Sequence, residues 1–334
     1  MPVRSILLQR FLATVLIAIV CGGCAQNRLY DSYERLQYSH EVMGTTFTVT
    51  LYTDNKENAD KAAEAAFNRL DALNQILSDY EDDSELSLLS ASSGSDTWVP
   101  LSDELYTVLR TSHEISEKSG GAFDPTVGPL SVQWRMAQHT GRLPRPEAIQ
   151  TLKQRVGYQK VLLDHEKKAA KLTTLKMKLD LGGIAKGYAL DEAMRTLESF
   201  GITRVLIDGG GDLLAADPPP GKTGWPVTLS HQDMSITLAN EAAATSGDAS
   251  RYVEIDGKRY SHILDPHTGM GMINRCHATV FARSGMYADA LASALCVLGP
   301  DKSKDMIAQY TKTRATMTKI MGANTNHFSF GIKE

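Results

Sequence analysis

Alternating apolar and polar residues predict a half-buried strand near the start of the folded chain. In TTFTVTLY, residues 45–52, Phe47, Val49 and Leu51 alternate with threonines, which is the period of a strand with one buried face. Over residues 59–80 the period changes to that of a helix. The apolar residues that share one face of this helix are Ala63, Ala66, Phe67, Leu70 and Leu77.

Two further helices are indicated by their ends as well as by their periodicity. Residues 102–119 have Ser102 placed as the N-cap and Gly120 placed to end the helix. The other helix begins within LDLGGIAKGYALD, residues 179–191, and stops at Gly201. Its apolar stripe consists of Leu190, Ala193, Met194 and Leu197.

Turn residues locate the remaining elements. Asp256-Gly257 in SRYVEIDGKRYSHIL is typical of a tight hairpin. Helices and strands interleave, but hairpins are also present, so the sequence predicts an α+β fold of mixed sheets with packed helices, formed by residues 42–334 as one domain. The other expected elements are a short helix introduced by Pro144 and Pro146, strands at 160–163, 203–208 and 277–282, a loop at 217–224, a helix at 285–298, and a final helix and strands.

The first 23 residues have the pattern of a secretory signal. Arg4 and Arg10 precede an apolar run, residues 11–20, that is too short to span a bilayer and is followed by CGGC. The pattern resembles a bacterial lipoprotein signal, in which Cys24 becomes the acylated first residue of the mature chain. A plain secretory signal is the alternative, because Cys21 stands where an aliphatic residue is usual.

Either signal exports the mature chain. We expect residues 24–41 to be a polar tether and the body to lie on the periplasmic side of the cell envelope, anchored by lipid to the membrane, the inner one by preference. Cys276 and Cys296 are then the cysteines of the body, in an oxidising space. The sequence leaves them either paired or free.

The composition is that of an ordinary soluble globular protein. Hydrophobic residues make up 42%, charged residues 22%, and the formal net charge is −4. Without an excess of basic residues, the chain is not expected to bind nucleic acid. The chain has no dinucleotide G-x-G-x-x-G after a strand, no P-loop, no H-E-x-x-H and no G-x-S-x-G, which disfavours Rossmann, P-loop, zinc-hydrolase and serine-hydrolase sites.

The stretch DLGGIAKG combines an aspartate, two glycines and a lysine at a helix start. Amide N–H groups at a helix N-terminus lack intrahelical partners, and glycines let an anion approach them closely. Lys186 would add a full positive charge near Asp180 and Gly183. The stretch is therefore either a phosphate site or a glycine-rich turn with a solvated lysine.

ADALASALCVLG offers oxygen ligands on an otherwise apolar helix. Asp289 and Ser293 are four residues apart and share a face. One carboxylate, one hydroxyl and a carbonyl suit Mg²⁺, which takes the rest of its shell from water and substrate phosphates. The alternative is that Asp289 faces water near the helix start.

YSHILDPHTG supplies a candidate general base, His262. Simple strand alternation places Tyr260, His262 and Leu264 on one face and Ile263 on the other. A single histidine on a strand is more often structural, and DPHTG can be an ordinary turn.

Taken together, the segments resemble the ApbE family of FAD:protein FMN transferases. The motifs occur in order along nearly the whole mature chain: MGTTF, SDYEDDSELS, GGAFDPTVGPL, VGY, LDLGGIAKGYALD, IDGGGDL, ATSGD, RYSHILDPHTG and YADALASAL. The resemblance implies an α+β, T-fold-related architecture with a flavin cleft between two subregions. It implies FAD contacts at Met43, Tyr80, Ala122, Phe123, Asp124, Asp180, Lys186 and Ile263, and a magnesium site at Gly183, Asp289 and Ser293, where threonine is usual at the last position.

The chemistry that the resemblance implies is Mg²⁺-dependent transfer of FMN from FAD to a threonine or serine hydroxyl of a partner protein, with release of AMP. Lys186, Asp289 and His262 are the expected catalytic residues. Acceptors in the family are redox subunits of membrane electron-transfer complexes such as the sodium-translocating quinone reductase. The alternatives are a Mg²⁺-dependent FAD pyrophosphatase and a lipoprotein that binds FAD without turnover.

Overall fold

The computed structural model describes residues 32–229, 234–248, 252–273, 275–321 and 324–331. The predicted signal, residues 1–23, and the predicted lipidation site, Cys24, lie outside these residues. Among the helices that are described, none combines the length and the apolar character needed to cross a membrane.

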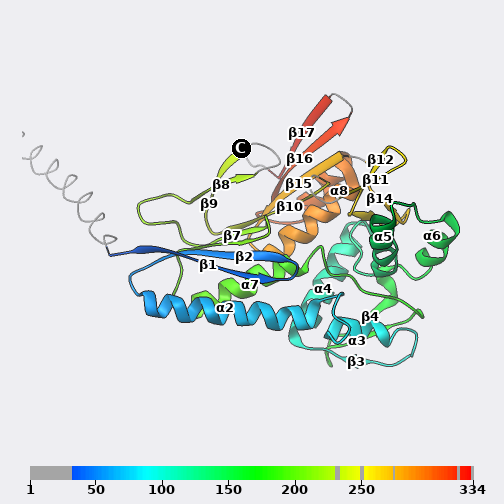
Figure 1. Ribbon diagram of the computed structural model, residues 1–334, viewed down its shortest axis with the longest axis horizontal. Coiled ribbons are helices and arrows are strands. Elements are labelled where there is room, and N and C mark those ends of the chain that lie inside the picture. The colour runs from blue at the N-terminus through cyan, green and yellow to red at the C-terminus, as the bar shows by residue number, and fades with distance from the viewer. Residues whose placement is uncertain (1–31, 230–233, 249–251, 274, 322–323, 332–334) are drawn as a thin grey trace, which may run out of the picture.

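One eight-stranded sheet is the centre of the fold, with the strand order β1-β2-β6-β7-β10-β15-β16-β17 (Figure 1). Its strands are β1 (Glu34–Val42), β2 (Thr45–Thr53), β6 (Val205–Gly209), β7 (Leu213–Ala215), β10 (Glu241–Gly247), β15 (Arg275–Ala282), β16 (Arg314–Met321) and β17 (Asn324–Phe330). The predicted α+β class is confirmed. The expectation of mixed strand directions is wrong, because every strand pair in the described residues is antiparallel.

The first strand corrects the predicted tether. Residues 34–41, assigned to the tether, belong to β1, which pairs along its whole length with β2. The sequence carries a signal for this strand, since Leu36, Tyr38, His40 and Val42 alternate with more polar residues and face the less exposed side. The folded body therefore begins earlier than residue 42.

Three helices cover one face of the sheet and enclose the main core. These are α2 (Lys56–Leu77), α7 (Ala185–Ser199) and α8 (Gly285–Ala308). In Figure 1, α2 runs across the lower left of the view and α7 lies between it and the sheet. The predicted strand face is confirmed, with Phe47, Val49 and Leu51 fully buried against the helices. A kink at Gly299, before Pro300, divides α8 where the sequence predicts two helices.

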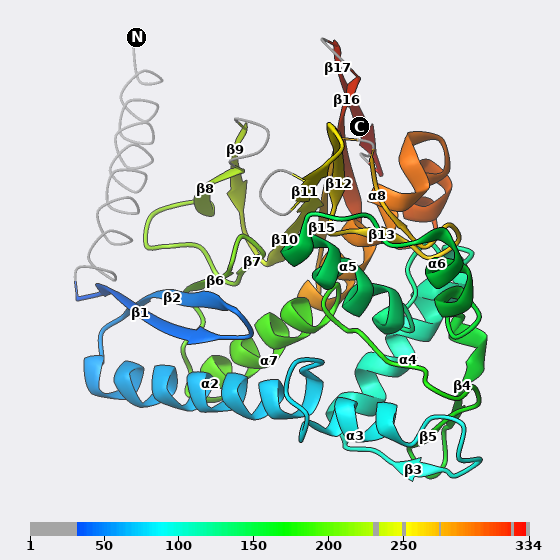
Figure 2. The same cartoon turned by 45° about the vertical axis from the view of Figure 1, so that its right-hand side comes forward.

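A second region lies beside the sheet, on the right of Figure 2. It comprises α3 (Glu85–Ala91), α4 (Asp103–Lys118), α5 (Gly128–Thr140), α6 (Pro146–Lys153), the short 3₁₀ helix η1 (Tyr158–Lys160), and a small sheet of β3 (Val99–Pro100), β5 (Ala169–Leu172) and β4 (Val161–Asp164). The predicted N-cap of α4 is confirmed, because Ser102 Oγ accepts from Leu105 N at 3.2 Å. The sequence did not predict α5.

Three two-stranded hairpins complete the described chain: β8 (Trp225–Leu229) with β9 (Met234–Leu238), β11 (Tyr252–Ile255) with β12 (Lys258–Ser261), and β13 (Leu264–Asp265) with β14 (Met270–Gly271). The Asp256-Gly257 hairpin is confirmed, with φ of 50° and 69° at its two central residues. The predicted alternation through His262 is wrong, because β12 ends at Ser261 and the chain bends there. Tyr260 and Ser261 are consecutive and both buried.

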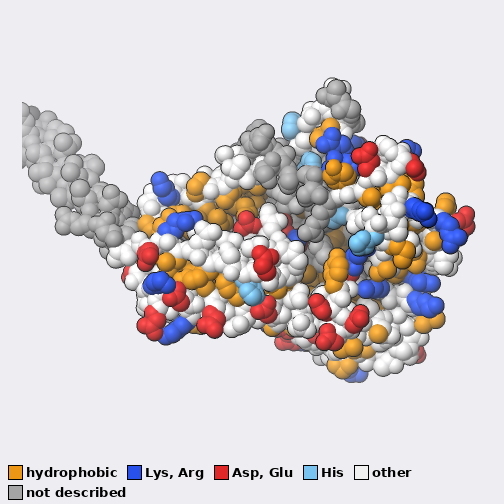
Figure 3. Space-filling model, in the orientation of Figure 1, with side chains coloured by type: hydrophobic (Ala, Val, Ile, Leu, Met, Phe, Trp, Pro, Cys, Tyr) orange, Lys and Arg blue, Asp and Glu red, His pale blue; other side chains and the backbone are white. Residues whose placement is uncertain are grey.

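The face shown in Figure 3 carries acidic and basic side chains together. This matches a chain whose formal charge is close to neutral, and the distribution on this face is typical of a solvated protein surface.

Candidate active site

The start of α7 meets the first turns of α8 at an unusually close helix crossing. A Cβ atom on Gly187 would lie 2.5 Å from the carbonyl carbon of Gly285 and 2.8 Å from the Cβ of Asp289. Only glycine allows the two backbones to approach this closely. As a result, the Gly187 amide donates to Asp289 Oδ2 at 3.1 Å. The crossing thus places the α8 carboxylate at the start of α7.

Asp289 lies in a buried cluster of charge. Its exposure is 3%, and burial raises the pKa of its carboxyl to about 6, while Lys186 opposes this and Asp212 adds to it. Lys186 Nζ is 3.7 Å from Asp289 Oδ2 and forms a hydrogen bond with Asp212 Oδ2. The alternative that Asp289 faces water is therefore wrong. Asp212, from IDGGGDL, was not among the predicted site residues.

The amide groups at the start of α7 are largely used within the protein. Gly182 N donates to Asp180 Oδ1, Ile184 N and Ala185 N donate to Leu181 O, and Gly187 N donates to Asp289. The sequence-based idea of a cradle of unpaired amides is therefore wrong for these four groups. Lys186 adds a positively charged side chain at this helix start, and that side chain is itself paired with Asp212 and Asp289.

Ser293 lies close to Gly183 and one helical turn from Asp289, so the three residues predicted to bind magnesium are neighbours. Ser293 shares a helical face with Asp289, and a Cβ atom built on Gly183 would lie 3.0 Å from Ser293 Oγ. Ser293 Oγ is also 3.0 Å from Ser246 Oγ on β10. The described residues contain no group of three or more His, Cys, Asp or Glu side chains that could hold a metal. A buried carboxylate one helical turn from a serine hydroxyl nevertheless supplies oxygen ligands of the kind that a hard cation such as Mg²⁺ prefers.

The predicted flavin contacts at Ala122, Phe123 and Asp124 form a buried loop against this cluster. Phe123 Cε2 would be 3.4 Å from a Cβ on Gly183. Asp124 holds the loop together, because its carboxylate accepts from Thr126 N at 2.8 Å and from Tyr158 N at 3.0 Å. Burial raises the pKa of Asp124, and these donors oppose the rise. Its contacts in the structure are those of a loop-fixing residue.

Tyr80 and Asp180 are brought together by Arg135, a residue of α5 that the sequence did not single out. The Arg135 guanidinium lies 4.0 Å from the Tyr80 ring centroid, 3.5 Å from Asp180 Oδ2 and 2.7 Å from Asp79 Oδ2. The Asp79 side chain is only 7% exposed, whereas Tyr80 is 72% exposed. An exposed aromatic ring fixed by a cation is suited to stack on a planar ligand.

We expect Arg135→Ala to destabilise the protein by about 2 kcal/mol at neutral pH, because it leaves the buried Asp79 carboxylate without its partner. Burial already raises the pKa of Asp79. The loss should therefore shrink as the pH falls and Asp79 becomes protonated in the variant. Denaturant unfolding at pH 7.5 and at about pH 4.5 measures this, with Arg142→Ala, an exposed position just beyond α5, as the control. An equal loss at both pH values would contradict the assignment.

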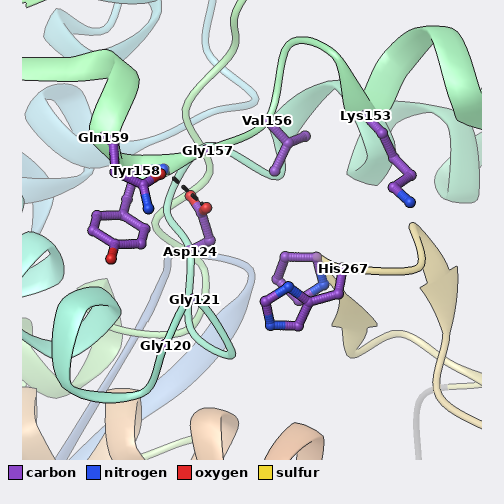
Figure 4. Close-up of a pocket in the computed structure, with 10 residues that line it drawn as sticks. Gly120, Gly121, Asp124, Lys153, Val156, Gly157, Tyr158, Gln159 and His267 are labelled. Carbon is purple, nitrogen blue, oxygen red and sulfur yellow. Dashed lines mark hydrogen bonds between the residues drawn. The ribbon is translucent and has the colours of Figure 1, made fainter.

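A pocket of about 160 Å³ opens beside the loop that contains Ala122, Phe123 and Asp124 (Figure 4). It joins three sequence motifs, since GGAFDP, VGY and DPHTG all contribute to its lining. His267 projects into it, and the Asp124–Tyr158 hydrogen bond forms part of its wall. Its volume is below the roughly 300–1,000 Å³ of pockets that enclose a whole drug-sized ligand, so it could take one moiety of a larger molecule.

The remaining predicted residues stand on separate segments. Met43 occupies the β1–β2 turn with φ of 52°. His262 follows β12 with its side chain exposed, and the partly buried Ile263 packs against the main core. The bend after Ser261 explains how His262 and Ile263 leave the strand faces that alternation assigns to them. The structure groups Gly183, Lys186, Asp289 and Ser293 with one another, and Tyr80 with Asp180.

The two other cysteines are both buried, and neither forms a disulfide in the structure. Cys276 lies on β15 and Cys296 on α8, where the Cys296 thiol donates to Ser246 O at 3.4 Å.

Comparison with solved structures identifies the class of fold. The apo flavinyl transferase ApbE of Pseudomonas stutzeri superposes with a TM-score of 0.78 at 27% identity, covering 90% of this chain and 95% of that one. A histidine-to-glycine variant of the flavin transferase ApbE from Vibrio cholerae gives a TM-score of 0.79 at 27% identity, covering 89% and 98%. The architecture is therefore that of the flavin transferases.

The sequence comparisons identify the family. The ApbE family model matches residues 43–317. The FAD:protein FMN transferase of Escherichia coli K12 is 30% identical over 308 residues, covering 89% of this chain and 88% of the relative. The enzyme of that name from Treponema pallidum is 30% identical over 320 residues, covering 89% and 87%. The chain belongs to the ApbE family.

Proposed function

We propose that this protein is a Mg²⁺-dependent FAD:protein FMN transferase. It would transfer FMN from FAD to a threonine or serine hydroxyl of a partner protein and release AMP. The observation that carries the proposal is the buried cluster of Lys186, Asp289 and Asp212 at the α7–α8 crossing. A cation-binding carboxylate next to a fixed ammonium suits a diphosphate, which needs its charge neutralised when one of its bonds breaks.

In this reaction the acceptor oxygen forms a bond to the FMN phosphorus while the bond from that phosphorus to the AMP oxygen breaks. Lys186 would stabilise the charge that develops on the phosphate oxygens. His262 would take the proton of the acceptor hydroxyl, a role that its exposed position after β12 permits. Gly183, Asp289 and Ser293 would hold Mg²⁺, which supplies further charge neutralisation at the diphosphate when bound.

The flavin ring itself would be bound by the second group of residues. Tyr80 would stack on it, supported by Arg135, and the loop of Ala122, Phe123 and Asp124 would line its approach to the phosphates. Met43 and Ile263 complete the proposed set of contacts. The protein would act at the periplasmic side of the membrane, anchored through Cys24, on redox subunits of membrane electron-transfer complexes.

A direct assay tests the proposal. The full-length protein, in detergent, is incubated with FAD, Mg²⁺ and an acceptor subunit carrying the threonine motif of the family's acceptors. The acceptor should then be fluorescent on a denaturing gel, with one AMP released for each flavin attached. Release of FMN and AMP without labelled acceptor would show that the protein is a pyrophosphatase and not a transferase. Intact FAD in every sample would show that the protein binds FAD without turnover.

A further inference from the structure

The Lys186 ammonium is shared between two buried carboxylates, those of Asp212 and Asp289. Its closer contact is with Asp212, which has no role of its own in the proposed reaction. The ammonium forms a hydrogen bond with Asp212 Oδ2, but stands 3.7 Å from Asp289 Oδ2. The Asp212 and Asp289 side chains are only 5% and 4% exposed. At neutral pH the three formal charges sum to −1 when both carboxyls are ionised.

Asp212 is itself firmly held. Its other carboxylate oxygen, Oδ1, accepts from Thr245 N on β10 at 3.2 Å, and its carbonyl accepts from Gly209 N at 2.8 Å. Gly210 and Gly211, with φ of 72° and 96°, form the tight turn that returns the chain to this position. The carboxylate is therefore fixed to the sheet, independently of Lys186.

A fixed carboxylate partner can hold a lysine ammonium in one position. The four-carbon side chain of lysine loses much rotamer freedom when it is held in one place. Among the described residues, the Lys186 ammonium also pairs with the Asp289 carboxylate. There the ammonium would compete with a cation for the same carboxylate.

We infer that Asp212 is a positioning residue, which keeps the Lys186 ammonium directed at the FAD diphosphate and away from the Asp289 carboxylate. The inference rests on the proposed function. Asp212 acts through Lys186 and touches neither substrate nor metal. It gives a role to the IDGGGDL motif.

A double-mutant cycle tests this, using Asp212→Asn, Lys186→Met and the double variant. Two quantities are measured in the full-length protein: kcat for FMN transfer, and Mg²⁺ affinity by calorimetric titration without FAD. We expect Asp212→Asn alone to lower kcat by about 10- to 100-fold and to weaken Mg²⁺ binding, because the ammonium moves onto Asp289. In the Lys186→Met background the same substitution should change either quantity by less than about threefold.

Asp208→Asn is the matched control, because Asp208 belongs to the same turn, accepts from Gly211 N at 2.8 Å and is half-buried. It should leave both quantities unchanged. Equal losses from Asp212→Asn in both backgrounds would overturn the inference, since Asp212 would then act by its own charge. The Mg²⁺ titration needs no turnover. The protein could show no transferase activity while Asp212→Asn still weakens Mg²⁺ binding only when Lys186 is present. That result would reject the proposed function and keep the positioning role of Asp212.

Discussion

Asp289→Asn should abolish FMN transfer, with kcat reduced on the order of 10³-fold. Asp289 is the one charged member of the proposed metal set, and asparagine keeps its shape while removing the charge. The Gly187 amide that donates to Asp289 can still donate to an asparagine carbonyl, so the helix crossing should be preserved. Ser293→Thr, the substitution to the residue usual in the family, serves as the matched control and should retain activity. Activity of Asp289→Asn within tenfold of the unmodified protein would contradict the assignment.

The same variant should be more stable than the unmodified protein at neutral pH when no divalent metal is present. The folded-state pKa of Asp289 is about 6, above its ordinary value of 3.8, so the unfolded state ionises first and stability is lost as the pH rises from about 4 to about 6. At 1.36 kcal/mol for each pKa unit, the gain on substitution approaches about 3 kcal/mol above pH 7 and vanishes below about pH 4. Denaturant unfolding in EDTA across this range measures it. A variant that is less stable at pH 8, or a difference independent of pH, would refute the burial argument.

Gly187→Ala should destabilise the protein by about 3 kcal/mol or more, because the added methyl group meets backbone atoms of Gly285 that cannot move without separating α7 from α8. Helix propensity alone predicts the opposite sign, a gain of up to about 1 kcal/mol for alanine over glycine in a helix interior. The measurement is thermal or denaturant unfolding of the purified variant.

Gly182→Ala is the control for this substitution, since there the new Cβ atom meets only the Asp180 side-chain oxygen, at 3.1 Å. It should cost much less. A neutral or stabilising effect of Gly187→Ala would contradict the close approach of α7 and α8 that places Asp289 at the start of α7.

Local patterns were sufficient for the elements with strong periodicity. The buried face of β2 and the stripe of α7 were predicted because each is a repeat visible within a few residues. The hairpin at Asp256-Gly257 was predicted because its turn requires positive φ at both residues. By contrast, α5 was missed: its N-cap position is Val127, which makes no side-chain capping bond, and it begins with Gly128-Pro129. Its place is fixed by tertiary contacts, including Trp134 Nε1 donating to Gly269 O at 2.9 Å.

The site was predictable where residues are close in sequence and not where the sheet brings them together. Asp289 and Ser293 are one helical turn apart, so their shared face follows from the spacing. Asp212 lies in the turn between β6 and β7 and reaches Lys186 on α7 through the tertiary fold, and Arg135 reaches Tyr80 and Asp79 through the packing of α5. His262 was assigned to a regular strand because nothing in its neighbours indicates that β12 stops at Ser261.

The most direct test is a crystal structure of the protein with FAD and Mn²⁺, in which anomalous scattering locates the metal without reference to the fitted chain. The account predicts one peak at bonding distance from the Asp289 carboxylate, the Ser293 hydroxyl and the Gly183 carbonyl, with the FAD diphosphate completing the shell beside Lys186. A metal bound elsewhere, or a diphosphate in bulk solvent remote from Asp289, would contradict it.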